Sequence, residues 1–148
     1  MDARITGVRV AGTPGGPTPV VVLAVEDSED RLPIFVGVDQ ATSIARGLDA
    51  VDIGRPLTHD LLLDVVETLG GRVTGVHVTD LREDTYIATL DVDTPRGPES
   101  VDARPSDALA LAARTGVPVT VDESVFEAGS EPPETFGDLA DIREVVEL

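Results

Sequence analysis

The chain has 148 residues, with 28 Asp and Glu against 11 basic residues, all of them Arg, and it contains no Cys. This length suits one domain with one core, and the absence of Cys excludes disulfides, thiolate catalysis and Cys-ligated zinc. The net charge of -17 excludes a broadly basic nucleic-acid-binding surface. Any contact with phosphates would depend on a local Arg cluster or on bound metal ions.

The acidity also bears on the solvent in which the chain folds. Charge repulsion opposes compaction, and it is largely screened only when the Debye length falls to ~3 Å near 1 M salt. We therefore expect a halophilic protein that needs molar salt to stay folded. The alternative is an acidic protein from a GC-rich mesophile, which would also favour Arg over Lys.

The N-terminal residues lack a basic leader followed by an apolar segment, and no run approaches the ~20 apolar residues of a membrane helix. We expect a cytoplasmic protein with no membrane contact. Only three Phe, one Tyr and no Trp are present, so Val, Leu, Ile and Ala must fill the core. A Val-rich core favours β-sheet.

The first half of the chain predicts an antiparallel meander followed by two helices. Alternating or continuous apolar residues predict strands over 3–10, with a bulge at Gly7, and over 20–26 and 32–38. Helical spacing predicts a helix over 40–50, with Asp39 as its N-cap. A second helix, capped by Thr58, would present one apolar face and end at Gly70. The residues of that face are Leu61, Leu62, Val65, Val66 and Leu69.

The second half predicts a hairpin, a short strand and another helix. The strands are expected over 72–79, 85–92 and 99–103, and a helix of small residues then ends at Gly116. A short extended segment, one or two helical turns and an acidic linker should follow, and the last residues have the spacing of an amphipathic helix. The chain is thus predicted to be α+β, with six or seven mostly antiparallel strands and three or four helices. The compact domain would span 1–128, and the linker and terminal helix 129–148.

His59 and Asp60 are the first candidates for chemistry. Imidazole and carboxylate side chains together can bind a cation or exchange protons, as in metal phosphohydrolases. The alternative is structural, because Asp60 in a first helical turn is favoured by the helix dipole. His77 alternates with two strand valines and is interpreted as a surface or packed histidine.

A second polar cluster lies between the last predicted strand of the sheet and the helix that follows it. Carboxylates can hold Mg²⁺ or Mn²⁺, and an Arg can bind a phosphate beside helix amides. Capping of the helix by Ser106 or Asp107, together with pairing of Arg104 to a neighbouring Asp, explains the same residues without a ligand. The cluster consists of Asp102, Arg104, Ser106 and Asp107.

Several segments in this order resemble the bifunctional nuclease family, long described as a domain of unknown function. The resemblance covers about 1–128, and the charge would suit a member from a high-salt archaeon. The segments are Leu32–Gly37, Ala41–Leu48, Arg55–Leu61, Leu69–Gly71, Thr79–Leu81, Tyr86–Leu90 and Val101–Leu111.

This resemblance implies a compact, self-associating α+β domain, with plant members that degrade DNA and RNA. The leading hypothesis is a metal-assisted nuclease. In it, Asp102 and Asp107 hold Mg²⁺ or Mn²⁺, while Arg55, Arg104 and Ser106 bind substrate. Proton transfer and catalysis are assigned to His59, Asp60 and Asp107.

Two other interpretations stay open. The same residues could stabilise strand–helix corners in a non-catalytic binding, assembly or regulatory module. The helix start at Ser106 could also bind a phosphorylated metabolite, as in a small-ligand sensor. Convergence of His59 on Asp107 in the folded chain is the geometric feature that would favour chemistry.

Overall fold

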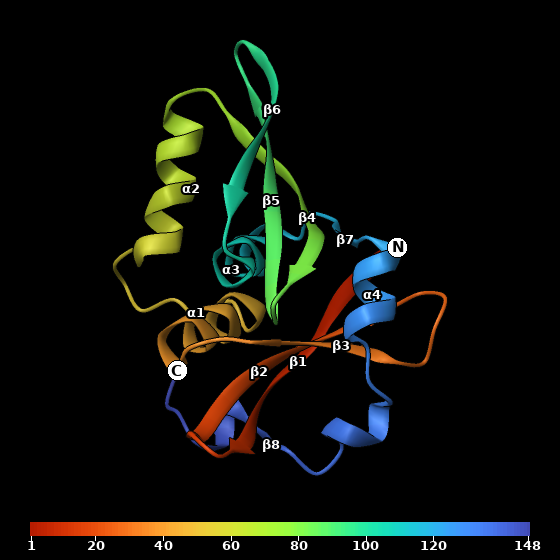
Figure 1. Ribbon diagram of the computed structural model, residues 1–148. Helices are drawn as coiled ribbons and strands as arrows, with labels where there is room; N and C mark the ends of the chain where they lie inside the picture. The colour runs from red at the N-terminus through yellow and green to blue at the C-terminus, as the bar shows by residue number, and fades with distance from the viewer.

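The computed structural model describes all residues from Met1 to Leu148 and begins with the predicted antiparallel meander (Figure 1). A register shift between Ile5 and Gly7 confirms the predicted bulge. β2 is buried from Pro19 to Val25, as its continuous apolar run requires. The meander consists of β1 (Asp2–Thr13), β2 (Gly16–Val25) and β3 (Arg31–Phe35).

Two helices follow, α1 (Val38–Leu48) and α2 (Thr58–Thr68). Their positions agree with the sequence prediction, but their caps do not. The N-cap of α1 is Gly37, with no side-chain hydrogen bond, and Asp39 lies in the first turn. The N-cap of α2 is Leu57, whose amide donates to Asp60 Oδ2 at 3.0 Å. A carboxylate inside the first turn thus satisfies the amide of the N-cap residue, and Thr58 is the first residue of the helix rather than its cap.

A second antiparallel meander forms the other half of the sheet. Register shifts at Val73/Gly75 and Val78/Asp80 bend its first strand, where the apolar alternation slips in phase. Its strands are β4 (Arg72–Arg82), β5 (Thr85–Thr94) and β6 (Gly97–Ala103).

The short strand β7 (Val119–Val121) joins the two meanders into one sheet. It pairs antiparallel with β1 and parallel with β4, which gives the order β3-β2-β1-β7-β4-β5-β6. β7 follows α3 (Pro105–Thr115), which ends at left-handed Gly116 as predicted and packs against α1, β4 and β5. α4 (Glu123–Gly129) packs against β3 and β4. The chain is therefore a single α+β domain with a mostly antiparallel sheet.

The last twenty residues do not form the predicted amphipathic helix. They form two 3-10 turns, η1 (Pro133–Phe136) and η2 (Ile142–Glu144), around the two-residue strand β8 (Ala140–Asp141), which pairs with β1. Phe136 packs on β2, and Ile142 enters the main core at 2% exposure. Apolar residues spaced for a helix are used here singly, and most of them pack against the sheet or the core, whereas Val145 faces solvent.

Helix α2 lies at the edge of the molecule and buries none of its residues (Figure 1). Only Leu63 and Val66 pack against the core. The predicted apolar face instead points largely to solvent, with Leu61, Leu62, Val65 and Leu69 all exposed. The sequence predicted the helix correctly and its burial wrongly, because apolar spacing alone does not say what covers a face.

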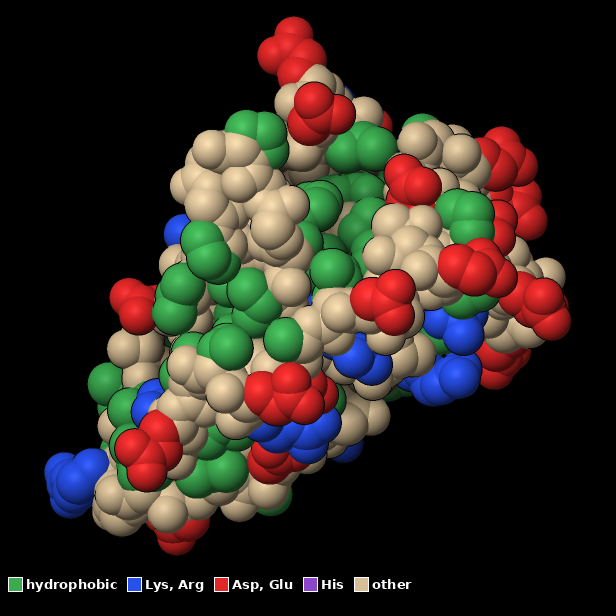
Figure 2. Space-filling view, turned by 90° about the horizontal axis from the view of Figure 1, so that it is seen from below, with side chains coloured by type: hydrophobic (Ala, Val, Ile, Leu, Met, Phe, Trp, Pro, Cys, Tyr) green, Lys and Arg blue, Asp and Glu red, His purple; other side chains and the backbone are tan.

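The surface is as acidic as the composition requires. Figure 2 shows acidic side chains spread over one face, with arginines beside several of them. None of the helices is long and apolar enough to span a bilayer.

Candidate functional site

His59 and Asp107 meet where the starts of α2 and α3 come together. His59 Nε2 lies 3.0 Å from Asp107 Oδ1, although the two residues are 48 positions apart in the chain. The second oxygen of Asp107, Oδ2, accepts a hydrogen bond of 2.8 Å from Arg104 Nε. His59 is largely shielded, with 13% of its side chain exposed. The convergence expected of a catalytic arrangement is therefore present.

The other ring nitrogen of His59 faces α1. Nδ1 lies 2.7 Å from the Ser43 hydroxyl. An ionised Asp107 can only accept, so the proton on the neutral imidazole must sit on Nε2, and Nδ1 then accepts from Ser43. Ser43, His59 and Asp107 thus form a relay of hydroxyl, imidazole and carboxylate.

Arg114, in the last turn of α3, fixes the Ser43 end of this relay by hydrogen bonds. Its side chain is only 9% exposed. Nη2 donates to Ser43 Oγ at 3.1 Å, and Nη1 donates to the carbonyls of Ser43 and Ala110. Nε donates to Asp60 Oδ1 at 2.7 Å. One buried guanidinium thereby links α1, α2 and α3.

The Asp60 carboxylate consequently makes its hydrogen bonds away from Ser43 and Asp107, the two partners of His59. Its two oxygens are taken by Arg114 and by the Leu57 amide. Burial raises the pKa of Asp60, but the Arg114 and Leu57 hydrogen bonds outweigh it and lower the pKa overall. The structural interpretation made for Asp60 from the sequence agrees with these contacts.

Asp107 also has a lowered pKa. Burial acts to raise it, and the hydrogen bonds from Arg104 and His59 outweigh that effect. The carboxylate therefore stays ionised at neutral pH, which keeps it an acceptor for His59. Pairing of Arg104 with Asp107, which the sequence suggested as a way to lock this turn, is present, whereas neither Ser106 nor Asp107 caps α3.

The relay lies at the wall of an open pocket of about 540 Å³. Two arginines line it, Arg46 and Arg104, and the buried Nε of Arg46 has no hydrogen-bond partner. Three carboxylates line it as well: Asp39, Asp107 and Glu147. We call this space the His59 pocket.

The remaining predicted residues lie elsewhere. Arg55 is exposed on the connector before α2 and lines a different hollow with Asp60. Asp102 and Ser106 line a second pocket, which the His59 pocket adjoins through Gln40 and Arg104, the two residues that line both. His77, the other histidine, pairs with Asp122 at 2.6 Å, outside both pockets.

The carboxylates and imidazoles of the two pockets do not form a cage for a divalent cation. No group of three or more His, Asp or Glu side chains is arranged to hold a metal ion. Asp102 and Asp107 line different pockets, and both oxygens of Asp107 are already hydrogen-bonded. These residues fit Mg²⁺ or Mn²⁺ only if a substrate phosphate supplies further ligands, as is common for Mg²⁺.

Three residues of this site were not singled out from the sequence: Ser43, Arg46 and Arg114. Ser43 is buried in α1, and its neighbours one turn away on the same face, Gln40 and Arg46, are polar as well. Nothing in the sequence therefore set its hydroxyl apart. Arg114 could be explained by the dipole of α3, and nothing in the sequence points to its contacts with two other helices.

Fold and site together define the class of protein: an α+β domain with a polar pocket where the starts of two helices meet. A family model described as the bifunctional nuclease domain matches residues 21–134. The chain belongs to the bifunctional nuclease domain family, as the order of its segments suggested.

Individual relatives match most of the chain, and the plant ones are named bifunctional nucleases. An uncharacterized protein of Mycobacterium tuberculosis is 38% identical over 125 residues, which cover 84% of this chain and 73% of that protein. Bifunctional nuclease 2 of Oryza sativa subsp. japonica is 33% identical over 74% of this chain. Bifunctional nuclease 1 of Arabidopsis thaliana is 32% identical over 72% of it. The matches span only 35% and 34% of these plant proteins.

The charge on Asp107 should contribute to stability in a pH-dependent way. A carboxyl whose folded pKa lies below its ordinary value of 3.8 stabilises the fold above that pH. This contribution is lost as the pH falls through the folded pKa. Asp107→Asn should lower the free energy of unfolding at pH 7 by on the order of 1 kcal/mol.

Urea unfolding of both proteins at several pH values between 7 and 3 measures this difference. It should shrink as the pH falls below 3.8. A difference that stays constant over this range would contradict the ion pairing of Asp107. Asp102→Asn is the matched control, because Asp102 is exposed and makes no ion pair, and it should change stability little at any pH.

Proposed function

We propose that this domain hydrolyses phosphodiester bonds of DNA or RNA in the His59 pocket. The observation that carries the proposal is the 3.0 Å hydrogen bond between His59 and Asp107 at the wall of a pocket that two arginines also line. The names of the plant relatives support the same reaction class.

In this proposal His59 moves the proton. Asp107 holds the Nε2–H, so Nδ1 is the nitrogen that takes a proton from the Ser43 hydroxyl or from a water in its place. The oxygen that loses this proton forms a bond to phosphorus while the P–O bond to the leaving nucleotide breaks, and the imidazolium gives the proton to that leaving oxygen. Where Ser43 is the attacking group, a water activated in the same way then hydrolyses the phosphoserine. The imidazolium that forms is stabilised by the ionised Asp107, and Arg114 donates to the Ser43 oxygen. Arg104 and Arg46 would bind the phosphate and offset the developing negative charge.

A requirement for Mg²⁺ or Mn²⁺ is part of the proposal. Bound to the substrate phosphate and to one carboxylate, Asp107 or Asp102, the cation would stabilise charge on the phosphoryl oxygens. It would also reduce the repulsion between a nucleic acid and a chain of net charge -17.

Cleavage of end-labelled single-stranded DNA and RNA is the direct test, in high KCl with Mg²⁺ or Mn²⁺ and with EDTA. His59→Ala should lower the rate about 10²- to 10⁴-fold, the usual contribution of a general acid or base. EDTA should abolish cleavage.

His77→Ala is the matched control, because His77 also pairs with an Asp but lies outside the pocket. It should leave the rate unchanged. Equal cleavage by wild type and His59→Ala, purified alike, would assign the activity to a contaminant or another site.

A second candidate function, assembly with a further copy of the chain, is favoured by the exposed apolar face of α2. Three large apolar residues of this helix, and Leu69 at its C-cap, face solvent. Such a face recurs on every copy and can cover itself across a two-fold axis. The expected partner is a second copy, in keeping with the homo-oligomer predicted from the sequence.

Sedimentation velocity in molar KCl tests this assembly. Leu62→Glu combined with Val65→Glu should convert a wild-type dimer or larger oligomer to monomer. Val145→Glu, at an even more exposed apolar position on the C-terminal segment, should not. A monomeric wild type at micromolar concentration would rule out this interface.

A further inference from the structure

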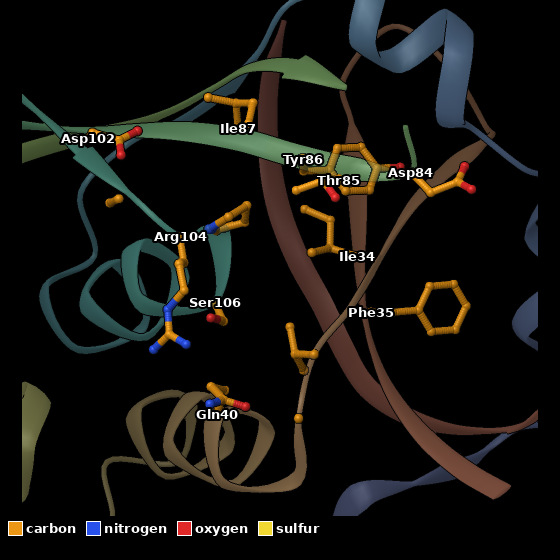
Figure 3. A pocket seen from close by; sticks show the side chains of 14 residues that line it. Ile34, Phe35, Gln40, Asp84, Thr85, Tyr86, Ile87, Asp102, Arg104 and Ser106 are labelled. Atoms are coloured by element: carbon orange, nitrogen blue, oxygen red, sulfur yellow. The ribbon is translucent and has the colours of Figure 1, made fainter. Parts of the chain in front are cut away.

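The second pocket, next to the His59 pocket, has a volume of about 460 Å³ and an uneven chemical lining (Figure 3). At one end lie Gln40, Arg104 and Ser106; at the other lie Ile34 and Tyr86, with Ile87 above them on β5. We call this space the Tyr86 pocket. Its two ends call for a ligand that is anionic at one end and flat and apolar at the other.

The polar end has unused hydrogen-bonding capacity. Ser106 is only 8% exposed, yet its hydroxyl makes no hydrogen bond within the protein. The Ser106 Oγ atom is not fully enclosed, since Arg46 Nε is the only enclosed side-chain atom without a partner; the open side of the hydroxyl faces the pocket. A polar group in so buried a residue normally has a hydrogen-bond partner, which a ligand can supply here. Figure 3 shows this hydroxyl at the wall of the pocket, so a ligand can reach it.

Two helix starts add donors beside Ser106. Helix α3 begins here without a side-chain cap, and so does α1 at Gly37, which also lines the pocket. Uncapped first-turn amides attract anions. Arg104 uses only Nε to hold Asp107, and its two Nη groups are free of protein partners. These donors suit a phosphate group.

The apolar end suits an aromatic ring. Ile34, Tyr86 and Ile87 line it, and such surfaces take up planar, weakly solvated groups. Asp102 lies at the margin of the pocket, away from Ser106, whereas Asp84 lies beside Tyr86. Their carboxylates can accept hydrogen bonds from amino groups such as those of nucleobases.

We propose that the Tyr86 pocket binds one nucleotide, with its phosphate at Ser106, Arg104 and the start of α3, and its base against Ile34, Tyr86 and Ile87. The proposal rests on the proposed function in one respect: the bound nucleotide is taken to be the neighbour of the cleaved bond. Arg104 lines both pockets and would contact the phosphates on either side.

Binding of AMP, measured by calorimetry in high KCl, is the test, with adenosine and inorganic phosphate as the two partial ligands. Tyr86 is the only tyrosine and there is no Trp, so the intrinsic fluorescence of the chain reports on this pocket alone. AMP should bind more tightly than either partial ligand and change that fluorescence. If phosphate binds as tightly as AMP, the base-binding half of the proposal is wrong.

Ser106→Ala should weaken AMP binding about tenfold, the effect of losing one hydrogen bond to a charged group. It should not lower the thermal stability of the free protein, because the lost hydroxyl has no protein partner. Ser100→Ala, on exposed β6, is the control and should leave binding unchanged. AMP binding that is absent, or that Ser106→Ala does not affect, overturns the proposal.

Two further measurements distinguish nucleotide binding in the Tyr86 pocket from hydrolysis in the His59 pocket. His59→Ala should keep AMP binding while losing cleavage. Ser106→Ala should raise the KM for an oligonucleotide more than it lowers kcat, and the dinucleotide ApA should displace AMP. AMP binding in a protein that cleaves nothing would refute the proposed function and leave the pocket assignment standing. Failure of ApA to displace AMP would refute the link between the pockets.

Discussion

The buried guanidinium of Arg114 is the interaction on which the arrangement of the helices depends. Helix α2 buries none of its own residues, so apolar packing holds it only through Leu63 and Val66. Polar contacts supply the rest, from Arg114 to Asp60 and from His59 to both Ser43 and Asp107. Loss of a partner would leave a buried charge uncompensated, which is far costlier than the loss of an exposed pair.

The same contacts that hold α2 also orient His59 in the way that the proposed proton transfer requires. Asp107 fixes the ring through Nε2, and Arg114 fixes the Ser43 hydroxyl that faces Nδ1. Stability and the proposed chemistry therefore rest on overlapping residues. This overlap explains why the sequence alone left a structural and a functional interpretation open for the residues around His59 and Asp107.

Much of the fold could be predicted, because periodicity and breakers act locally. The bulge near Gly7, the phase slip near Gly75 and the end of α3 at Gly116 all follow from single residues. The C-terminal segment could not be predicted, since the spacing around Ile142 fits a helix equally well. Only the presence of β1 as a pairing partner selects the extended form that β8 adopts.

The site was predictable in part for a similar reason. The sequence pointed to His59 and Asp107, and the fold brings them together. The sequence could not show that Asp60, which directly follows His59, pairs with Arg114 instead. That contact depends on how α3 crosses α2. The place of Ser43 depends on the packing of α1 against α3, which also lies outside local sequence rules.

The central claim is that Asp107 fixes the proton of His59 on Nε2, and nitrogen-15 NMR of the imidazole rings tests it most directly. The chain has only two histidines, so the signals can be assigned by substitution of His77. At a pH where the ring is neutral, the account predicts that His59 is the Nε2–H tautomer. Asp107→Asn should shift its signals while leaving those of His77 in place. A neutral His59 protonated on Nδ1, or signals that do not respond to Asp107→Asn, would contradict it.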